Sequence, residues 1–458
     1  MISVLHEPEN RLSAYGLNRF ISKFGLERES GGLAIGYGNV KNGIKLIENN
    51  LENATCGAVH FGDSIIPVFS RPVEVAGDVV ATFSDGIYEY PVIARDGDLL
   101  ICGMDAFLHT GAFLSGYLER FWPPIAKESA FLARVPLADA MERMIFEIAA
   151  ELAKEKEVEF RAKPFWPDGA PFALGLSHDV DLYRKTVQYF SHAWKHATSF
   201  EFKKCFRNLA GAMLMGAKNP YWNFGKLQKL EADLGVKSTV FFLNQPRGNA
   251  GRGVGAGLHD AGACRYDAPG IPEAMRTLSD SGWEVCVHQS IETFGDADGL
   301  RRDKELLDGV IANESTGVRQ HYLLMDFANS FAVQESAGFS YDSTIGFSDA
   351  AGFRTGTCFP YPVYDCAAGH ELNIVEIPLT LMERTAIEKD DPYAYALGTI
   401  KTVEEFGGCA VLLWHQRFFN ETEFPGYADL YRRIIDYCKR KGAWIATLGE
   451  IHRWWSAR

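Results

Sequence analysis

Two aspartates end an apolar run near the middle of this 458-residue chain. Residues 174–183 read LGLSHDVDLY, so Asp179 and Asp181 follow directly after a segment that is suited to burial. Burying an ionisable group costs several kcal/mol unless that group is paired with another charge or bound to a metal. We therefore expect an apolar strand whose polar end faces a site with general acid–base or metal chemistry.

Polar side chains also end most of the later apolar runs. They are Asn244, His288, Arg319 with His321, Asp342, Glu376 and His415. The active site of a parallel barrel lies at the carboxyl ends of its strands. These side chains are therefore expected to converge on one site.

The spacing of the apolar runs predicts the fold class. From residue 172 onward, short runs alternate with helix-length connections, which favours a parallel sheet with helices on its faces. The run count and a length of about 290 residues favour an irregular (β/α) barrel of seven to eight strands. The earlier part of the chain combines short strand-like runs with amphipathic helices and predicts a smaller α+β domain.

A proline-rich stretch separates these two patterns. Residues 161–172 read RAKPFWPDGAPF, and prolines at this density prevent a helix from crossing the segment. We therefore predict an N-terminal α+β domain over 1–163 and a (β/α) barrel over 164–458.

The composition narrows the class of partner and the compartment. The 46 basic and 59 acidic residues give a net charge of −13, which disfavours nucleic acids and anionic membranes as partners. The first twenty residues do not resemble a signal peptide, and no run of about 18 apolar residues is present to span a bilayer. The nine cysteines lack CxxC pairs, which predicts reduced thiols and a cytoplasmic location.

Four short motifs, in order, resemble the polysaccharide deacetylase superfamily (carbohydrate esterase family four, the nodulation-protein-B homology domain). SHDVD is similar to its Thr-Phe-Asp-Asp motif, VHQS to His-Ser/Thr-x-x-His, and LLWH to its closing Leu-x-His, while VRQHY falls at its Arg-x-x-Tyr motif. The match covers residues 172–458. Phrases such as GFSYDSTIGF resemble a bacterial subgroup with a separate N-terminal domain.

Two departures from the family pattern affect the expected metal site. Asp179-Val180-Asp181 replaces the adjacent aspartates, and the second histidine of the second motif is absent. The resemblance implies that Asp181 and His288 are ligands of a divalent metal, with Zn²⁺ as the first choice. Catalytic zinc typically has three protein ligands and one open position. For the third ligand we favour His321, at a neighbouring strand end, over Glu292, which lies in a polar loop; His288 alone also fits a buried core histidine.

The resemblance also implies catalytic roles for four residues. Asp179 would be the general base, with Arg319 holding it ionised and oriented. His415 would be the general acid that protonates the leaving amine, and Asp342 would orient it. Two simpler interpretations stay open, because Arg319 also fits an ordinary buried salt bridge and the YDST around Asp342 also fits a turn or cap.

Three further residues are candidates for substrate contact. Tyr322 follows the third motif, and Trp414 is selected only because it is aromatic. His178 stands where the family has an aromatic residue, and it either packs beneath the site or contacts a metal ligand.

Together these features predict a metal-dependent deacetylase, a hydrolase of carbon–nitrogen bonds other than peptide bonds. Its substrate is expected to carry an N-acyl group, with N-acetyl favoured, on an amino sugar or a related small amide. A soluble glycan precursor, a nucleotide sugar or a lipid-linked sugar suits a cytoplasmic enzyme better than a cell-wall polymer does. Two alternatives remain: a metal-free barrel that binds glycan without turnover, and a metal amidohydrolase acting on a cyclic or N-formyl substrate.

Overall fold

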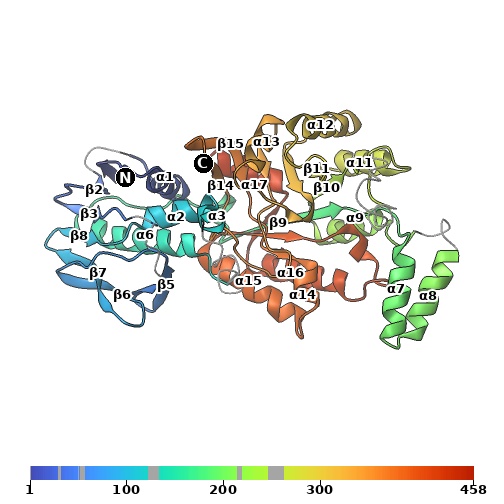
Figure 1. The fold of residues 1–458 in the computed structure, drawn as a ribbon, viewed down its shortest axis with the longest axis horizontal. Coiled ribbons are helices and arrows are strands. Elements are labelled where there is room, and N and C mark those ends of the chain that lie inside the picture. The colour runs from blue at the N-terminus through green and yellow to red at the C-terminus, as the bar shows by residue number, and fades with distance from the viewer. Residues whose placement is uncertain are drawn as a thin grey trace.

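A computed structural model describes most of the chain and contains two sheets (Figure 1). The described residues are 2–28, 32–49, 51, 57–121, 134–213, 219–245 and 262–458. The eight-stranded sheet belongs to the N-terminal part of the chain and the ten-stranded sheet to the C-terminal part.

The N-terminal sheet is mixed, with strand order β1-β2-β3-β8-β7-β6-β4-β5. Its strands are β1 (Ile2–Leu5), β2 (Leu33–Tyr37), β3 (Gly43–Leu46), β4 (Gly57–Phe61), β5 (Ser64–Val68), β6 (Asp78–Ser84), β7 (Glu89–Asp96) and β8 (Leu99–Cys102). The first four in spatial order are parallel and the rest antiparallel. The helices of this part are α1 (Arg11–Phe24), α2 (Ala106–Leu114), α3 (Tyr117–Phe121) and α6 (Leu137–Glu155). This is the predicted smaller α+β unit.

The C-terminal sheet has the order β14-β15-β13-β12-β11-β10-β9-β17-β16, with β18 also paired to β9. Its strands are β9 (Ala173–Val180), β10 (Thr239–Leu243), β11 (Glu284–Gln289), β12 (Gly317–Gln320), β13 (Tyr341–Asp342), β14 (Tyr361–Asp365), β15 (His370–Glu376), β16 (Leu381–Met382), β17 (Cys409–Leu413) and β18 (Trp444–Ala446). Every pairing is parallel except that of β14 with β15.

Helices connect these strands, as expected for parallel neighbours. They are α7 (Gln188–Thr198), α8 (Phe202–Met213), α9 (Phe224–Leu234), α11 (Ile271–Asp280), α12 (Ala297–Ile311), α13 (Ser330–Ser336), α14 (Glu383–Ile387), α15 (Pro392–Phe406), α16 (Tyr427–Arg440) and α17 (Leu448–Ser456). Short 3₁₀ turns are η1 (Pro167–Gly169), η2 (His321–Leu323) and η3 (Gln416–Phe419).

The predicted fold class is confirmed, with the barrel in an open form. In the part of the chain that the structure describes, no ladder joins β16 to β14 or β15, so the parallel sheet curls without closing. Among the same residues, no helix is long and apolar enough to cross a membrane.

A buried polar cluster joins the two parts of the chain. Lys23 of α1 donates to Asp139 and Glu142 of α6, at 2.7 and 2.6 Å. Asp139 also accepts from the hydroxyl of Thr357 and the backbone N–H of Cys358, both of which belong to the C-terminal part. Each part nevertheless has an apolar core of its own. We propose that residue 163 is the last of the N-terminal domain.

Candidate active site

The two aspartates of β9 share a face because strand side chains alternate. Ser177, Asp179 and Asp181 stand two residues apart, so all three point to the same side of the sheet, while His178 points to the other. All eight residues of β9 are buried, so the polar residues at its carboxyl end need buried partners.

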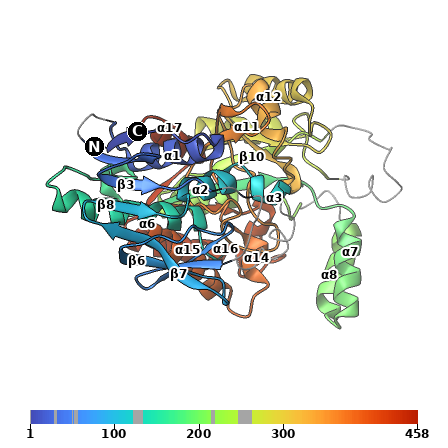
Figure 2. The same cartoon turned by 60° about the vertical axis from the view of Figure 1, so that its left-hand side comes forward.

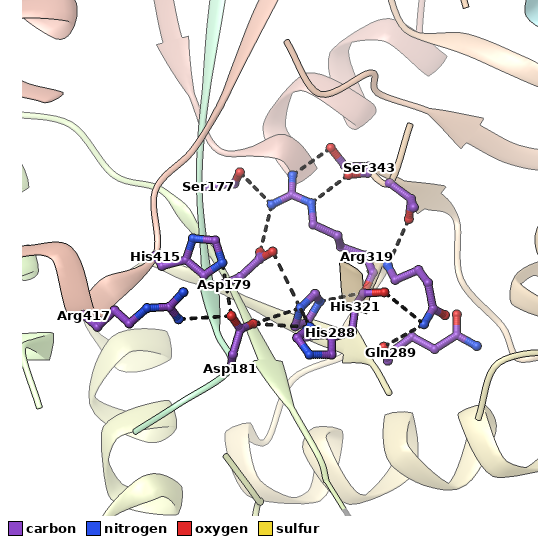
Figure 3. A network of polar contacts seen from close by, with 12 residues as sticks. Ser177, Asp179, Asp181, His288, Gln289, Arg319, His321, Ser343, His415 and Arg417 are labelled. Carbon is purple, nitrogen blue, oxygen red and sulfur yellow. Dashed lines mark hydrogen bonds and ion pairs between the residues drawn. The ribbon is translucent and has the colours of Figure 1, made fainter. Parts of the chain in front are cut away.

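Strand register brings further polar residues to this edge. In β11 and β12, His288 lies directly beside Arg319, and His321 follows at the end of β12. β17 lies next to β9 on the other side, and His415 comes two residues after β17 ends. Figure 3 shows these side chains converging on Asp179 and Asp181. The predicted base, metal ligands and acid therefore occupy one site.

Three ligand atoms form a tight triangle in this site. Asp181 Oδ1 lies 3.2 Å from His288 Nε2 and 3.5 Å from His321 Nδ1, and the two imidazole nitrogens are 3.1 Å apart. A tetrahedral zinc ion with ligand bonds of about 2.0–2.1 Å separates its ligands by about 3.3 Å. The triangle therefore has the size that such an ion needs.

The chemistry of these three donors also suits a metal. Asp181 Oδ1 is buried, and none of the described residues donates a hydrogen bond to it. His288 Nδ1 donates to the backbone carbonyl of Arg319 at 2.9 Å, so in the neutral ring Nε2 presents its lone pair to the triangle. Burial lowers the pKa of His321 to about 4, which keeps that ring neutral, whereas Asp179 and Asp181 raise the pKa of His288 against its burial. The residues present therefore fit a divalent cation.

A second group of potential ligands, Asp179, Asp181 and His415, overlaps the first. In that group the outer oxygen of Asp181, Oδ2, already faces the guanidinium of Arg417 and the imidazole of His415, each at 3.1 Å. A cation there would lie beside a fixed positive charge. We therefore favour the group built from Oδ1.

Asp179 is held ionised beside the triangle. Arg319 Nη1 donates to Asp179 Oδ1 at 2.9 Å and also to Ser177 Oγ, while the rest of the guanidinium is bound by Ser343. Burial by itself would raise the pKa of Asp179, but the neighbouring His288, Arg319 and His415 together hold it below its usual range. The predicted pairing of Arg319 with Asp179 is present.

His415 is oriented by a residue that sequence reasoning missed. Its Nδ1 lies 2.8 Å from Glu383 Oε1, at the first position of α14, and its Nε2 lies 3.1 Å from Asp181 Oδ2. Burial by itself would lower the pKa of His415. Glu383 and, to a smaller extent, Asp181 outweigh this effect and raise the pKa to about 9. Arg417 was missed too, although it follows the fourth motif by only two residues.

Asp342 does not orient His415, which corrects the prediction. Its carboxylate accepts from Gln334 and Thr344, and it is Ser343, one residue later, that reaches Arg319. Burial raises the pKa of Asp342. The strand alternation that places Ser343 on the site face places Asp342 on the opposite face.

His178 and Trp414 are also absent from the substrate face, for the same reason. His178 is fully buried, donates through Nδ1 to the Trp414 carbonyl and faces Glu231 of α9 through Nε2 at 2.8 Å. Trp414 is fully buried against Tyr431 of α16. Both side chains pack beneath the site, between sheet and helices.

Tyr322 was predicted to contact the substrate, and Glu292 was the second choice for the third metal ligand. Tyr322 is exposed, and its ring contacts the ring of His321 at a tilt of 39°. Its φ of 60° is a left-handed conformation that is strained for a residue other than glycine. It remains a proposed substrate contact. Glu292 accepts from Gln245 at 2.9 Å and is not in either group of potential ligands.

No family model and no curated protein matches the sequence, so the similar proteins are those with solved structures. Solved structures that match at a probability of 1.00 include polysaccharide deacetylases. One, from Mycobacterium smegmatis, has 19% identity and a TM-score of 0.41, covering 64% of this chain and 92% of its own. The Puue allantoinase has 16% identity and a TM-score of 0.41, and the match covers 64% of this chain and 93% of the allantoinase. One from Pseudomonas aeruginosa has 17% identity and a TM-score of 0.40, covering 64% and 94%.

Proposed function

We propose that the chain is a metal-dependent deacetylase that hydrolyses an N-acyl group, with N-acetyl favoured, on an amino sugar or a related small amide. The observation that carries the proposal is the position of Asp181. Its Oδ1 faces His288 and His321 and accepts no hydrogen bond from the part of the chain that the structure describes, while its Oδ2 faces His415. One carboxylate thus joins a potential metal site to a potential acid.

Asp181, His288 and His321 would hold the cation, for which we propose Zn²⁺. Such an ion polarises a bound carbonyl and lowers the pKa of a bound water towards about 7. The base therefore needs only modest basicity, which suits Asp179 with its lowered pKa. Asp179 accepts a proton from the attacking water, and Arg319 keeps that carboxylate pointed at the site through Nη1.

His415 delivers the second proton transfer. Its raised pKa of about 9 keeps the imidazole protonated at neutral pH, and Glu383 leaves Nε2 as the nitrogen that faces the site. As the water oxygen bonds to the carbonyl carbon and the C–N bond breaks, His415 protonates the leaving nitrogen. The products are a carboxylate and a free amine.

A base, Asp179, and an acid, His415, on the same site favour an amide as the substrate. Protonation of the leaving atom matters most for an amine, which is a poor leaving group without a proton. The exposed ring of Tyr322 next to His321 is the proposed contact for an amino sugar. A soluble, nucleotide-linked or lipid-linked precursor is the form we propose.

The test is a product screen on the purified chain loaded with Zn²⁺. Free, nucleotide-linked and lipid-linked N-acetylated amino sugars are each incubated with it, and released acetate and new primary amine are quantified. We expect equal amounts of the two products, and none from an Asp179→Asn variant prepared in parallel. Release of formate or of a ring-opened acid would assign the site to another amidohydrolase reaction, and binding without products would assign it to glycan recognition.

A further inference from the structure

The helices α7 and α8 form a hairpin that stands away from the rest of the molecule (Figures 1 and 2). They pack chiefly on each other. Trp194, Phe206 and Met213 are 74%, 73% and 89% exposed. The complete set of exposed large apolar side chains on this hairpin is Phe190, Trp194, Phe200, Phe202, Phe206, Leu209 and Met213.

The exposed apolar residues follow helical spacing. On α8, Phe202, Phe206, Leu209 and Met213 recur at intervals of three and four residues, so they form one stripe along the helix. A stripe of this kind normally faces a protein core. Here it faces outward, which marks an interaction surface.

The hairpin is basic, although the chain as a whole is acidic. Residues 188–213, from the start of α7 to the end of α8, contain four Lys or Arg residues and a single acidic residue, Glu201, within a chain of net charge −13. Lys203 and Arg207 are exposed and stand one helical turn apart, adjacent to the apolar stripe. Exposed charges are screened over about 8 Å at physiological ionic strength, so a partner at the hairpin responds to this local charge.

The tip of the hairpin is shaped to present aromatic rings. Phe200, between the two helices, has a φ of 58° and is 81% exposed. That left-handed conformation is strained for phenylalanine, and glycine or asparagine would adopt it at lower cost. Phe200 also forms an edge-on contact with Phe202.

The base of the hairpin is anchored to the body. Buried Lys185 forms an ion pair with Glu423 and donates to Asn208 of α8. Tyr189 packs against Gly211, where a Cβ would lie 2.6 Å from its ring. The hairpin leaves the sheet just after Asp181, from the edge that carries the candidate active site.

We propose that the α7–α8 hairpin docks on an anionic lipid surface. Aromatic and aliphatic side chains enter the interfacial region, while lysine and arginine beside them contact acidic headgroups. The net charge of the whole chain disfavours anionic membranes as partners, but basic residues are concentrated beside the apolar stripe of α8. This inference is independent of the hydrolytic chemistry proposed above.

The test is sedimentation of the full chain with vesicles. Equal parts of phosphatidylglycerol and phosphatidylcholine are compared with phosphatidylcholine alone, at low and high salt. We expect binding to the anionic vesicles that weakens as salt rises, and little binding to the neutral ones. No binding to anionic vesicles at low salt would overturn the proposal.

Two pairs of variants locate the contact. Lys203→Glu with Arg207→Glu should lower the vesicle-bound to free ratio at least about tenfold, and so should Trp194→Ser with Phe206→Ser. The charge control is Lys229→Glu with Arg432→Glu, on other helices, and the apolar control is Ile87→Ser, at another exposed site. Both controls should bind as the parent chain does, and binding lost equally in them would overturn the assignment to this hairpin.

A second copy of the chain is the competing occupant. Sedimentation equilibrium of the parent chain and of Trp194→Ser with Phe206→Ser separates the two cases. A dimer of the parent that the double variant abolishes, without vesicle binding by the parent, would assign the stripe to self-association. Unchanged circular dichroism of each variant shows that a lost interaction does not reflect misfolding.

Discussion

Glu383 and His415 form a buried pair in which one carboxylate oxygen lies 2.8 Å from Nδ1 of the imidazole. The second carboxylate oxygen accepts from the backbone N–H of His415 at 3.3 Å, so both the ring and the backbone of this residue are held by one side chain. The far nitrogen of the ring is thereby directed at Asp181. This arrangement suits a group that donates a proton at a fixed point.

The first prediction concerns the pH dependence of kcat/KM. The acid must be protonated and the base deprotonated, so the profile should be bell-shaped. The value of kcat/KM should fall as the pH rises through about 9, the raised pKa of His415. The acid limb of the profile should lie below the usual pKa range of aspartate, because the pKa of Asp179 is lowered. His415→Ala should remove the alkaline limb and reduce the rate about 10²–10⁴-fold.

Metal content and leaving group serve as controls for that variant. His415→Ala should keep its metal, and an activated phenyl ester should lose less rate than an amide, because a phenolate leaves without much protonation. Equal losses for ester and amide, or release of the metal, would remove His415 from the role of acid.

The second prediction concerns Glu383. Glu383→Gln removes the carboxylate that raises the pKa of His415 most, so that pKa should fall. The alkaline limb of kcat/KM should move to lower pH, whereas a purely structural role would lower kcat without moving the limb. Glu383→Asp, which keeps the charge, should return the limb towards its original position.

The third prediction concerns metal binding. The chain dialysed against Zn²⁺ should hold about one ion, measured by plasma mass spectrometry, and His288→Ala should hold none, because two protein ligands remain. The matched control is His370→Ala, since His370 is exposed on β15 and outside both potential ligand groups. Full occupancy of the His288 variant would exclude this residue as a ligand.

The fourth prediction separates the two aspartates. Asp179→Asn should retain zinc and lose most activity, because an amide does not accept a proton from water. Asp181→Asn should weaken zinc affinity, since the oxygen facing His288 and His321 loses its negative charge. Titration with a competing chelator measures the affinities, and the reverse pattern would exchange the two roles.

The fifth prediction concerns the proposed boundary at residue 163. A chain of residues 164–458 contains the second apolar core and should fold cooperatively. Its stability should be lower than that of the full chain, because Asp139 no longer binds Thr357 and Cys358. Urea unfolding followed by circular dichroism measures both properties, and an insoluble or non-cooperative product would make the N-terminal part integral to the barrel.

A point variant in the full chain tests the same contact. Lys23→Met leaves Asp139 and Glu142 buried without their cation. Removing one partner of a buried ion pair costs about 3–5 kcal/mol, so the free energy of unfolding should fall by that amount. An unchanged unfolding midpoint would show that the cluster contributes no stability.

Much of the site could be predicted because parallel strands meet at one edge. Asp179, Asp181, His288, His321 and His415 end their apolar runs, and the structure places all five together. Strand alternation also predicts that His178 and Trp414 point away from the site, since each stands one residue away from a residue on the site face. The prediction that these two residues contact the substrate was wrong, because successive side chains of a strand point to opposite faces of the sheet.

Local sequence by itself determined which residues end strands and which face of a strand each one occupies, because both follow from apolar length and alternation. Only the tertiary structure decided the order of the strands. β17 pairs with β9, whereas β13 lies across the sheet beyond β12, β11 and β10, so His415 lies beside Asp181 and away from Asp342. Glu383, from the start of a short helix, completes the site through the pairing of β16 with β17. These pairings join segments far apart along the chain, and the packing of whole elements that selects them leaves no local pattern in the sequence.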